Sequence, residues 1–409
     1  MQTRRVVITG TGVVSPFGKG ADRLAAALEA GESGVSRLPE PAYAGNPGPQ
    51  VAGVIHDVDT SEIPRKNRRS MSPMSAYAFL AAQEALAQAG IGEEIVTGGR
   101  LGVSIGSTLG SVAELEAVFR EYLPAHSLDN VKALMFFRFM GHSVAANVAQ
   151  TLGVCGRVIG ASAACSSGAQ SIGLGYETVA HGLQDYMLCG GADEYHPLFP
   201  GTFDIMAAAS VGYNDAPQSA PRPFDKDRDG VVCSEGTGVV LLETLDSALT
   251  RGAEILAEVT GFSSTSDAAS IASPDPRPVR LCMEQALASA GLVPADIGYI
   301  NAHATGTRQG DIAESQAIAA LFGNTVPVSS LKGHLGHTMA ASGAIETIAC
   351  VAMMRKETLF PTRNLDTPAE ECSGILHLRQ PEARKVTHIL KNSFAFGGIN
   401  CSLILRNPK

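Results

Sequence analysis

Residues 157–182 read RVIGASAACSSGAQSIGLGYETVAHG, and this stretch decides the fold. A short apolar run typical of a strand leads into a loop of very small residues around Cys165, and a run with helical spacing follows. Residues 326–356 repeat this plan, because the strand-like VPVSSL leads through KGHLGH into a second helical run. Two copies of one strand–loop–helix unit predict an internal duplication.

The rest of the chain alternates apolar strand-like runs with alanine-rich helical runs, which is the pattern of an α/β fold. In the first part the expected strands are 4–15, 100–108, 157–165, 185–194 and 238–246, and the expected helices are 75–90 and 168–182. In the second part they are strands 253–265, 297–307, 326–331 and 377–380 and helices 278–291, 311–323 and 342–356. We therefore predict two halves, 1–250 and 251–409.

Composition narrows the class of protein. The 409 residues are 45% hydrophobic and 17% charged, which is enough to bury a large core. The eight cysteines lack the spacing of a disulfide framework or a zinc site, so we expect no metal and a reducing, cytoplasmic location. No apolar run approaches the roughly 20 residues that cross a bilayer, so we expect no membrane span. A net charge of −9 argues against general nucleic-acid binding.

Two motifs that suggest other functions fail on inspection. Residues 10–15, GTGVVS, follow a strand like a dinucleotide-binding fingerprint, but Ser15 stands where the third glycine belongs and Pro16 comes next. Residues 225–230, DKDRDG, open like a calcium loop, but Gly236 occupies the twelfth place and Glu235 falls one place short. We expect these acids to form a charged turn.

Cys165 is either a small buried filler or a nucleophile. A strand delivers it to the first turn of a helix, where free backbone N–H groups and the helix dipole favour a thiolate. Its small neighbours leave room for a substrate carbonyl, whereas a structural cysteine more often lies among bulky aliphatic side chains.

Two histidines also follow strands. His303 ends the apolar run 297–302, and His337 begins a helical run with Lys332 five residues before it. A single histidine is more often a hydrogen-bonded structural imidazole, and His334 in the same loop is an obvious competitor. His337 is nearest the helix N-terminus, where the dipole opposes protonation and favours a neutral ring.

Several blocks together carry a family resemblance. The segments AACSSG, NAHATGTRQGD, KGHLGHTMAASGAIE and NSFAFGGINCSLIL resemble the active-site blocks of the elongating, Cys-His-His branch of the β-ketoacyl-acyl carrier protein synthases, in the thiolase-like superfamily. The resemblance runs essentially from end to end. It implies two thiolase-like halves in five layers, α-β-α-β-α, with the nucleophile in the first half and two catalytic histidines in the second.

The resemblance also implies roles. Cys165 would accept the acyl group, and the N–H groups of Cys165 and Phe396 would bind the oxyanion. His303 and His337 would bind the malonyl thioester carbonyl while CO₂ leaves and a new carbon–carbon bond forms. Phe396 would also gate the acyl pocket. No cofactor is implied beyond the phosphopantetheine that carries the substrates.

Further residues match supporting parts of the family's site. Lys332 would organise the histidine pair electrostatically, with Glu346 as its ionic partner, because a buried lysine without a carboxylate is costly. Thr305 and Thr307 match the hydroxyls that bind the phosphopantetheine arm.

A basic cluster stands out in an otherwise acidic chain and consists of Arg65, Lys66, Arg68 and Arg69. It is either a solvated helix start or a surface for a negatively charged partner. The resemblance favours an acidic acyl carrier protein. It also implies a homodimer or a heterodimer with a chain-length partner.

Departures from the family pattern leave the primer open. Ile399 stands where threonine is common, and Ala272 stands where the fatty-acid enzymes often carry a hydroxyl. Phe137 and Phe139, expected near the acyl pocket and dimer interface, also differ from the usual pattern. Fatty-acid elongation and a specialised polyketide or polyene pathway are both compatible with the sequence.

Other classes explain fewer of these residues. A thiolase would carry a second catalytic cysteine in another setting than that of Cys401, and a silent chain-length partner would have lost Cys165. A cysteine-dependent thioester hydrolase would use Cys165 and His303 but leave His337 and Lys332 unexplained.

Overall fold

The structure is a computed structural model and describes residues 3–39, 48–268, 270–271 and 273–409. Within these ranges twelve strands form the main sheet, in the order β13-β11-β10-β15-β16-β9-β1-β8-β7-β5-β6, with β2 beside β1. The two halves of the sheet join where residues 6–8 of β1 pair with residues 257–259 of β9.

The first half of the sheet has the order β6-β5-β7-β8-β1. Its strands are β1 (Val6–Ser15), β5 (Leu101–Gly106), β6 (Val158–Ile159), β7 (Tyr186–Asp193) and β8 (Gly236–Thr244). β5 runs parallel to β6 and β7, whereas β7 with β8 and β8 with β1 are antiparallel pairs.

The second half repeats this topology strand for strand, in the order β11-β10-β15-β16-β9. Its strands are β9 (Ala257–Ser266), β10 (Tyr299–Asn301), β11 (Pro327–Ser329), β15 (His388–Phe394) and β16 (Ile399–Arg406). β10 runs parallel to β11 and β15, and the pairs β15 with β16 and β16 with β9 are antiparallel. The predicted duplication is confirmed.

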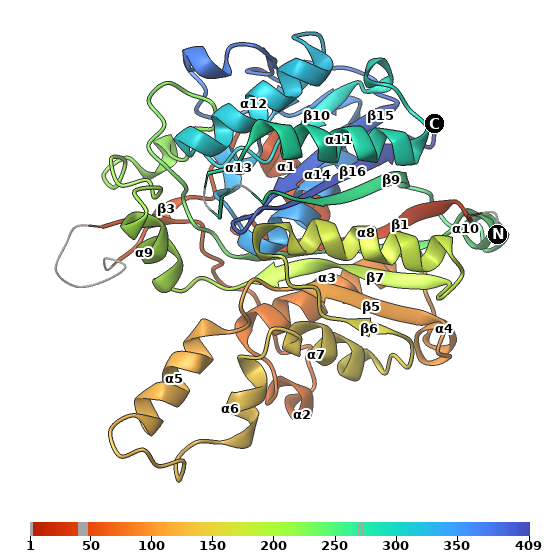
Figure 1. The fold of residues 1–409 in the computed structure, drawn as a ribbon. Coiled ribbons are helices and arrows are strands. Elements are labelled where there is room, and N and C mark those ends of the chain that lie inside the picture. The colour runs from red at the N-terminus through yellow and green to blue at the C-terminus, as the bar shows by residue number, and fades with distance from the viewer. Residues whose placement is uncertain (1–2, 40–47, 269, 272) are drawn as a thin grey trace.

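Helices complete five layers (Figure 1). The first sheet half is covered on its outer face by α3 (Pro73–Ala89) and α7 (Ser143–Leu152), and the second by α11 (Pro276–Ala290) and α12 (Arg308–Phe322). Between the halves lie α8 (Ser167–Ala180) and α14 (Ser342–Lys356), which contact strands of both. The α-β-α-β-α prediction is confirmed, and the predicted boundary after residue 250 falls between α10 and β9 and stays a prediction.

The glycines of β1 allow helix α3 to pack closely against the strand. All ten residues of β1 are buried, because helices cover both faces. A side chain at Gly10 or Gly12 would collide with the backbone carbonyls of Ala85 and Ala81 on α3. The fingerprint-like GTG is therefore the place where a helix approaches a strand closely.

The two central helices begin alike. The 3₁₀ turns η1 (Ala164–Ser166) and η4 (Met339–Ala341) precede α8 and α14, and each turn opens on a residue with positive φ, 45° at Ala164 and 51° at Met339. The middle residues of these turns, Cys165 and Ala340, are therefore counterparts in the two halves.

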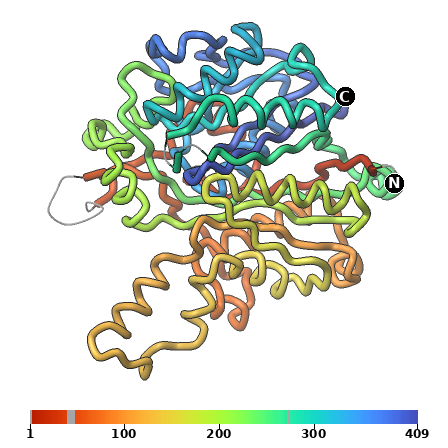
Figure 2. Tube along the Cα trace, in the orientation of Figure 1, coloured from red at the N-terminus to blue at the C-terminus, as the bar shows by residue number. Residues whose placement is uncertain are grey.

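The remaining elements are shorter or peripheral. The helices are α1 (Ala21–Glu29), α2 (Arg65–Arg68), α4 (Glu93–Thr97), α5 (Val112–Tyr122), α6 (Ala133–Arg138), α9 (Leu198–Ile205), α10 (Leu245–Thr250) and α13 (Lys332–Leu335). The minor strands are β2 (Gly18–Lys19), β3 (Ser36–Arg37), β4 (Val51–Ala52), β12 (Thr358–Leu359), β13 (Leu376–His377) and β14 (Glu382–Ala383). The segment with α5 and α6 projects from the body (Figures 1 and 2). No helix in the described ranges is both long and apolar enough to cross a membrane.

Candidate active site

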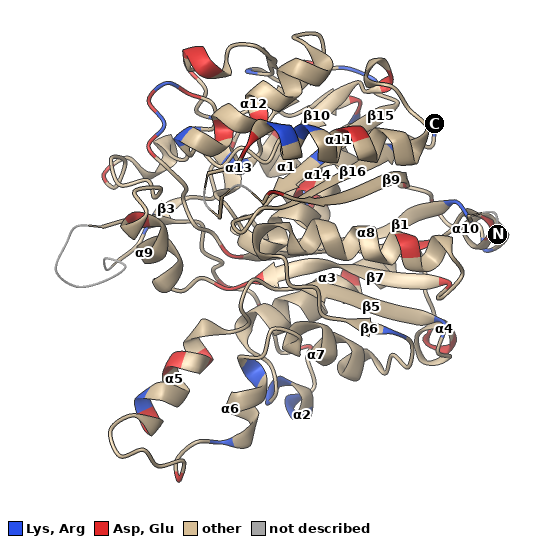
Figure 3. Cartoon of the chain, viewed as in Figure 1, with Lys and Arg blue, Asp and Glu red and all other residues tan. Residues whose placement is uncertain are grey.

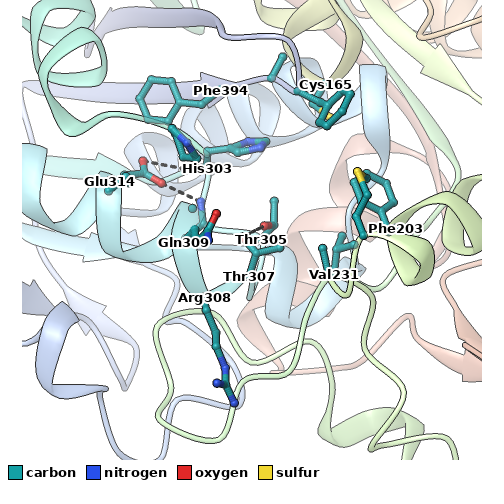
Figure 4. Close-up of a pocket in the computed structure, with 18 of the residues that line it drawn as sticks. Cys165, Phe203, Val231, His303, Thr305, Thr307, Arg308, Gln309, Glu314 and Phe394 are labelled. Carbon is teal, nitrogen blue, oxygen red and sulfur yellow. Dashed lines mark hydrogen bonds between the residues drawn. The ribbon is translucent and has the colours of Figure 1, made fainter. Parts of the chain in front are cut away.

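A pocket of about 440 Å³ opens between the two halves of the chain. Cys165 lines this pocket from the 3₁₀ turn η1. His303 comes from the loop after β10, and His337 comes from the loop between α13 and η4. These three residues, separated by up to 172 positions in sequence, line one cavity. Phe203 from α9 and Phe394 from β15 line it as well (Figure 4).

Cys165 is buried, with 5% of its surface exposed. Burial raises the pKa of its thiol to about 11, while the backbone N–H groups of Phe396 and of Cys165 itself favour the thiolate. The charge of Asp193 adds to the increase and that of Lys332 opposes it. The sequence suggested a lowered pKa at this helix start, and the structure reverses that direction because desolvation outweighs the backbone donors.

His303 and His337 form an edge-to-face pair, with ring centroids 5.2 Å apart and planes at 84°. Burial, and then the charge of Lys332, hold the pKa of both imidazoles well below the usual value, so both rings are neutral. The Nδ1 atom of His337 lies 2.9 Å from the Ser342 hydroxyl. Its Nε2 and the Nδ1 of His303 are buried and have no hydrogen-bond partner among the described residues.

His334 lies outside this arrangement. Its Nδ1 and Nε2 atoms are each 3.1 Å from a backbone carbonyl oxygen, of Glu32 and of Pro361. It is thus a structural imidazole, and the ambiguity between His334 and His337 is resolved by geometry.

Beneath the histidines lies a buried charge cluster. Lys332 Nζ is 2.5 Å from one carboxylate oxygen of Glu346, so the expected pair is present. The other oxygen of Glu346 lies 2.9 Å from Nζ of Lys391, a fully buried residue of β15. Sequence reasoning missed Lys391. The signal was a lysine inside the apolar run HILKNSF, where an unpaired charge is costly.

Two buried carboxylates on α12 hold the loop that carries His303, and sequence reasoning missed both. Glu314 accepts hydrogen bonds from the backbone N–H groups of His303 at 2.9 Å and Ala304 at 2.8 Å. Asp311 accepts from the N–H of Gly306 at 3.1 Å and of Phe224 at 2.7 Å. The three-residue spacing on one helix face was the available signal.

The DKDRDG segment forms a turn. The carboxylate of Asp225 accepts hydrogen bonds from the backbone N–H groups of Asp227, Asp366 and Thr367. In the part of the chain that the structure describes, no group of three or more His, Cys, Asp or Glu side chains is arranged to hold a metal ion.

The expected phosphopantetheine residues Thr305 and Thr307 line the pocket, with their hydroxyl oxygens 3.1 Å apart. Arg308 and Gln309 follow them and are exposed, and Arg308 extends away from Cys165 and His303 (Figure 4). Phe396, which the resemblance implies is a gate, also lines the pocket and is 46% exposed, and its role as a gate stays a prediction.

Other predicted residues are elsewhere. Ile399 begins β16 and, like Phe137 and Phe139 near α6, is half-buried and outside the set of described residues that line the pocket. Ala272 lies outside the described residues. The basic cluster Arg65, Lys66, Arg68 and Arg69 is exposed on and beside α2 (Figure 3), and its residues are not among the described residues that line the pocket.

An apolar cluster packs close to the sulfur. Its buried members are Val112, Phe199, Cys233 and Met339, with Tyr195 and Phe203 packed against them. The backbone of Cys233 also bridges that of His337. This side of the nucleophile therefore suits an alkyl chain more than a polar group.

Two matching α/β halves that meet at a buried cysteine and two neutral histidines define a condensing enzyme of the thiolase-like superfamily. Comparisons with known proteins agree. Residues 3–248 match the family described as "Beta-ketoacyl synthase, N-terminal domain", and residues 256–366 match "Beta-ketoacyl synthase, C-terminal domain". The chain belongs to the β-ketoacyl synthase family and is an enzyme of the acyltransferase type.

Individual relatives are similar over their whole length. The chain is 35% identical to 3-oxoacyl-[acyl-carrier-protein] synthase 1 of Haemophilus influenzae, over 98% of this chain and 99% of that protein. Among solved structures it resembles a β-ketoacyl synthase from Burkholderia phymatum, with a TM-score of 0.96, 40% identity and coverage of 99% and 100%. It also resembles one chain in the solved complex of a type II polyketide synthase acyl-carrier protein with its ketosynthase, with a TM-score of 0.91, 31% identity and full coverage of both chains.

Proposed function

We propose that this chain catalyses a decarboxylative condensation, in which malonyl-acyl carrier protein extends an acyl group held on Cys165 to give a 3-oxoacyl-acyl carrier protein two carbons longer. The observation that supports it best is the shared pocket, in which the sulfur of Cys165, two backbone donors and two neutral imidazoles surround a space large enough for a thioester.

The first half-reaction transfers the acyl group. The thiolate of Cys165 attacks the carbonyl carbon of an acyl thioester, and the carrier thiol leaves as the carbonyl re-forms. The N–H groups of Cys165 and Phe396 hold the oxyanion, and each such donor contributes about 3 kcal/mol to the transition state. Because burial raises the pKa of the resting thiol, its proton leaves as the sulfur attacks, and in the overall transfer that proton ends on the departing carrier thiol.

The second half-reaction forms the new bond. Malonyl thioester loses CO₂, the electron pair passes to the thioester oxygen, and N–H groups of His303 and His337 stabilise this enolate. If the Ser342 hydroxyl donates to Nδ1 of His337, the proton of that ring is on Nε2, the atom without a protein partner. The enolate carbon then attacks the acyl carbonyl and releases the Cys165 thiolate.

The substrates arrive on the phosphopantetheine of an acyl carrier protein. Thr305 and Thr307 bind that arm, and the exposed basic cluster around α2 receives the acidic carrier. The names of the relatives include such a carrier, which supports the assignment. We place the reaction in the cytoplasm, in fatty-acid or polyketide biosynthesis.

A homodimer, or a heterodimer with a chain-length partner, completes the proposal. β6 ends the sheet, and Val158 on this edge strand is 47% exposed. On and after α5 and α6, in the same half of the chain, Phe119, Leu123 and Phe136 are 47%, 56% and 56% exposed. A sheet edge and exposed apolar side chains are both features that a second subunit covers. Light scattering coupled to size-exclusion chromatography tests this.

The decisive experiment supplies malonyl carrier protein and an acyl primer, and measures CO₂ and the 3-oxoacyl product. Cys165→Ala abolishes condensation, whereas Cys165→Gln, which resembles a neutral acyl group in shape, retains malonyl decarboxylation. Cys155→Ala, at an exposed cysteine, is the matched control and keeps full activity. Hydrolysis of the primer without condensation, or product from Cys165→Ala, would contradict the proposal.

A further inference from the structure

The buried lysine on β15 has a place in the site that the condensation mechanism does not yet use. Lys391 is fully buried, and its strand is paired with β10 on one side and β16 on the other. Its Nζ lies 2.8 Å from the carbonyl oxygen of Asn392, 2.5 Å from the hydroxyl of Ser393 and 2.9 Å from Glu346. Two hydrogen bonds, to Asn392 and Ser393, and one ion contact with Glu346 hold the ammonium group in one place.

One carboxylate faces two ammonium groups here. Glu346 lies between Lys332 and Lys391, and all three side chains are at most 3% exposed. Relative to Glu346 the two ammonium groups carry one surplus positive charge, and Glu314 of α12 acts on Lys332 as a second carboxylate. In a buried environment such a charge acts on neighbouring groups with little screening.

The groups within electrostatic reach of Lys391 come from every element around it. They are Lys332 of α13, Glu346 and Cys350 of α14, Cys401 of β16, and His303 and His337 of the two loops. Lys391 lowers the pKa of both imidazoles, after burial and Lys332.

We propose that Lys391 is a positioning residue for the condensation, which holds Glu346 against Lys332 and supplies the second positive charge that keeps His303 and His337 neutral. This inference rests on the proposed function. Neutrality is useful because an imidazolium beside the malonyl carboxylate would stabilise the group that has to leave as CO₂, and so would favour the ground state over the transition state. Acylation of Cys165 serves as the internal comparison, because the backbone N–H groups of Phe396 and Cys165 and the charge of Lys332 favour its thiolate.

The test replaces the charge and keeps the apolar stem. Lys391→Met removes the surplus charge, so the acidic limb of the decarboxylation pH profile moves to higher pH by about one unit. Acylation of Cys165, followed by intact mass, stays within about twofold of the parent rate at pH 8. Lys391→Arg keeps the limb in place even if the rate falls, and ammonium ions added to Lys391→Met move the limb back.

The matched control is Lys385→Met, at an exposed lysine 3.8 Å from Glu357. It leaves both the rate and the profile unchanged. A Lys391→Met enzyme that is slower but has the parent pH profile would show a purely structural role and overturn the inference.

A second measurement covers the case in which Lys391→Met does not fold. Carbon-13 labelling of histidine in the parent enzyme, with assignment by His303→Asn and His337→Asn, gives both titrations directly. Either ring titrating at or above pH 6.5 would overturn the inference. This outcome can be separated from the proposed function. Lowered pKa values of both histidines in an enzyme that does not catalyse condensation would refute the function but would still support the effect of the charge cluster.

Discussion

Gly168 offers a direct test of whether the contact between the two central helices sets the site. It lies in the first turn of α8, three residues after Cys165, and a Cβ there would be 2.5 Å from the carbonyl oxygen of Ala340 and 3.2 Å from the nitrogen of Ala344. Gly168→Ala therefore forces α8 and the start of α14 apart by about 1 Å to restore van der Waals distances.

The size of the effect follows from two opposing contributions. Overpacking of this kind costs about 1 to 3 kcal/mol. Alanine in place of glycine in a helix recovers up to about 1 kcal/mol. We expect a net loss of about 1 to 2 kcal/mol in the free energy of unfolding. We expect a larger loss in turnover. Cys165 lies just before α8, and Ser342 on α14 is hydrogen-bonded to His337, so moving the two helices apart displaces both catalytic groups. A 1 Å misplacement of such groups costs about 100-fold in rate.

The assays are urea unfolding and the rate of 3-oxoacyl product formation. Gly141→Ala is the control, since a Cβ at Gly141 meets nothing within 4 Å and its φ suits alanine. We expect the control to match the parent in both measurements. A Gly168→Ala enzyme with the stability and turnover of the parent would refute the reasoning that the close approach of the helices holds the cysteine and histidine in register.

Three further predictions concern ionisation and loop support. With a thiol pKa of about 11, only about 0.03% of Cys165 is thiolate at pH 7.5, so iodoacetamide labels exposed Cys155 first, and labelling of Cys165 rises about tenfold per pH unit up to pH 11. Mass spectrometry of the two peptides checks this, and rapid labelling of Cys165 at pH 7 would refute it. Burial raises the pKa of Asp311 to about 7, so between about pH 4 and 7 the folded state keeps a proton that the unfolded chain releases, and stability falls as pH rises. Asp311→Asn flattens this part of the curve of thermal midpoint against pH, and an unchanged slope would contradict the assignment. Glu314→Gln replaces one accepting oxygen with an NH2 group, so either the N–H of His303 or that of Ala304 loses its acceptor, and urea unfolding should show a loss of about 1 to 3 kcal/mol.

The parts of the fold that sequence reasoning predicts are those with long periodic runs. The helix expected at 342–356 coincides with α14, and α8 begins within one residue of the prediction. The terminal hairpin of β15 and β16 was recognised only as a family block, because Lys391 and Asn392 interrupt the apolar run that signals a buried strand. These polar residues are tolerated there because Glu346 and Glu314 meet them from two different helices.

The same limit applies to the site. A cysteine before a helix and histidines after strands are local signals, so Cys165, His303 and His337 were within reach of the sequence. The direction of the thiol pKa was not, because it depends on desolvation by residues from both halves, which spacing along the chain does not report. Glu314 and Asp311 escaped notice for a related reason, since they bind backbone N–H groups of the loop after β10, and such partners leave no trace in side-chain composition.

The two turns that precede the central helices have similar backbones but different roles. Both turns open on a residue with positive φ, yet only one of them carries a thiol, that of Cys165. In the other turn, the backbone N–H of Ala340 donates to the carboxylate of Asp193 at 2.8 Å. That turn therefore stabilises the end of β7. A second thiol in this spot would compete for the same acyl chain. The turn without a thiol therefore leaves Cys165 as the single acyl acceptor of the two turns and gives it structural support.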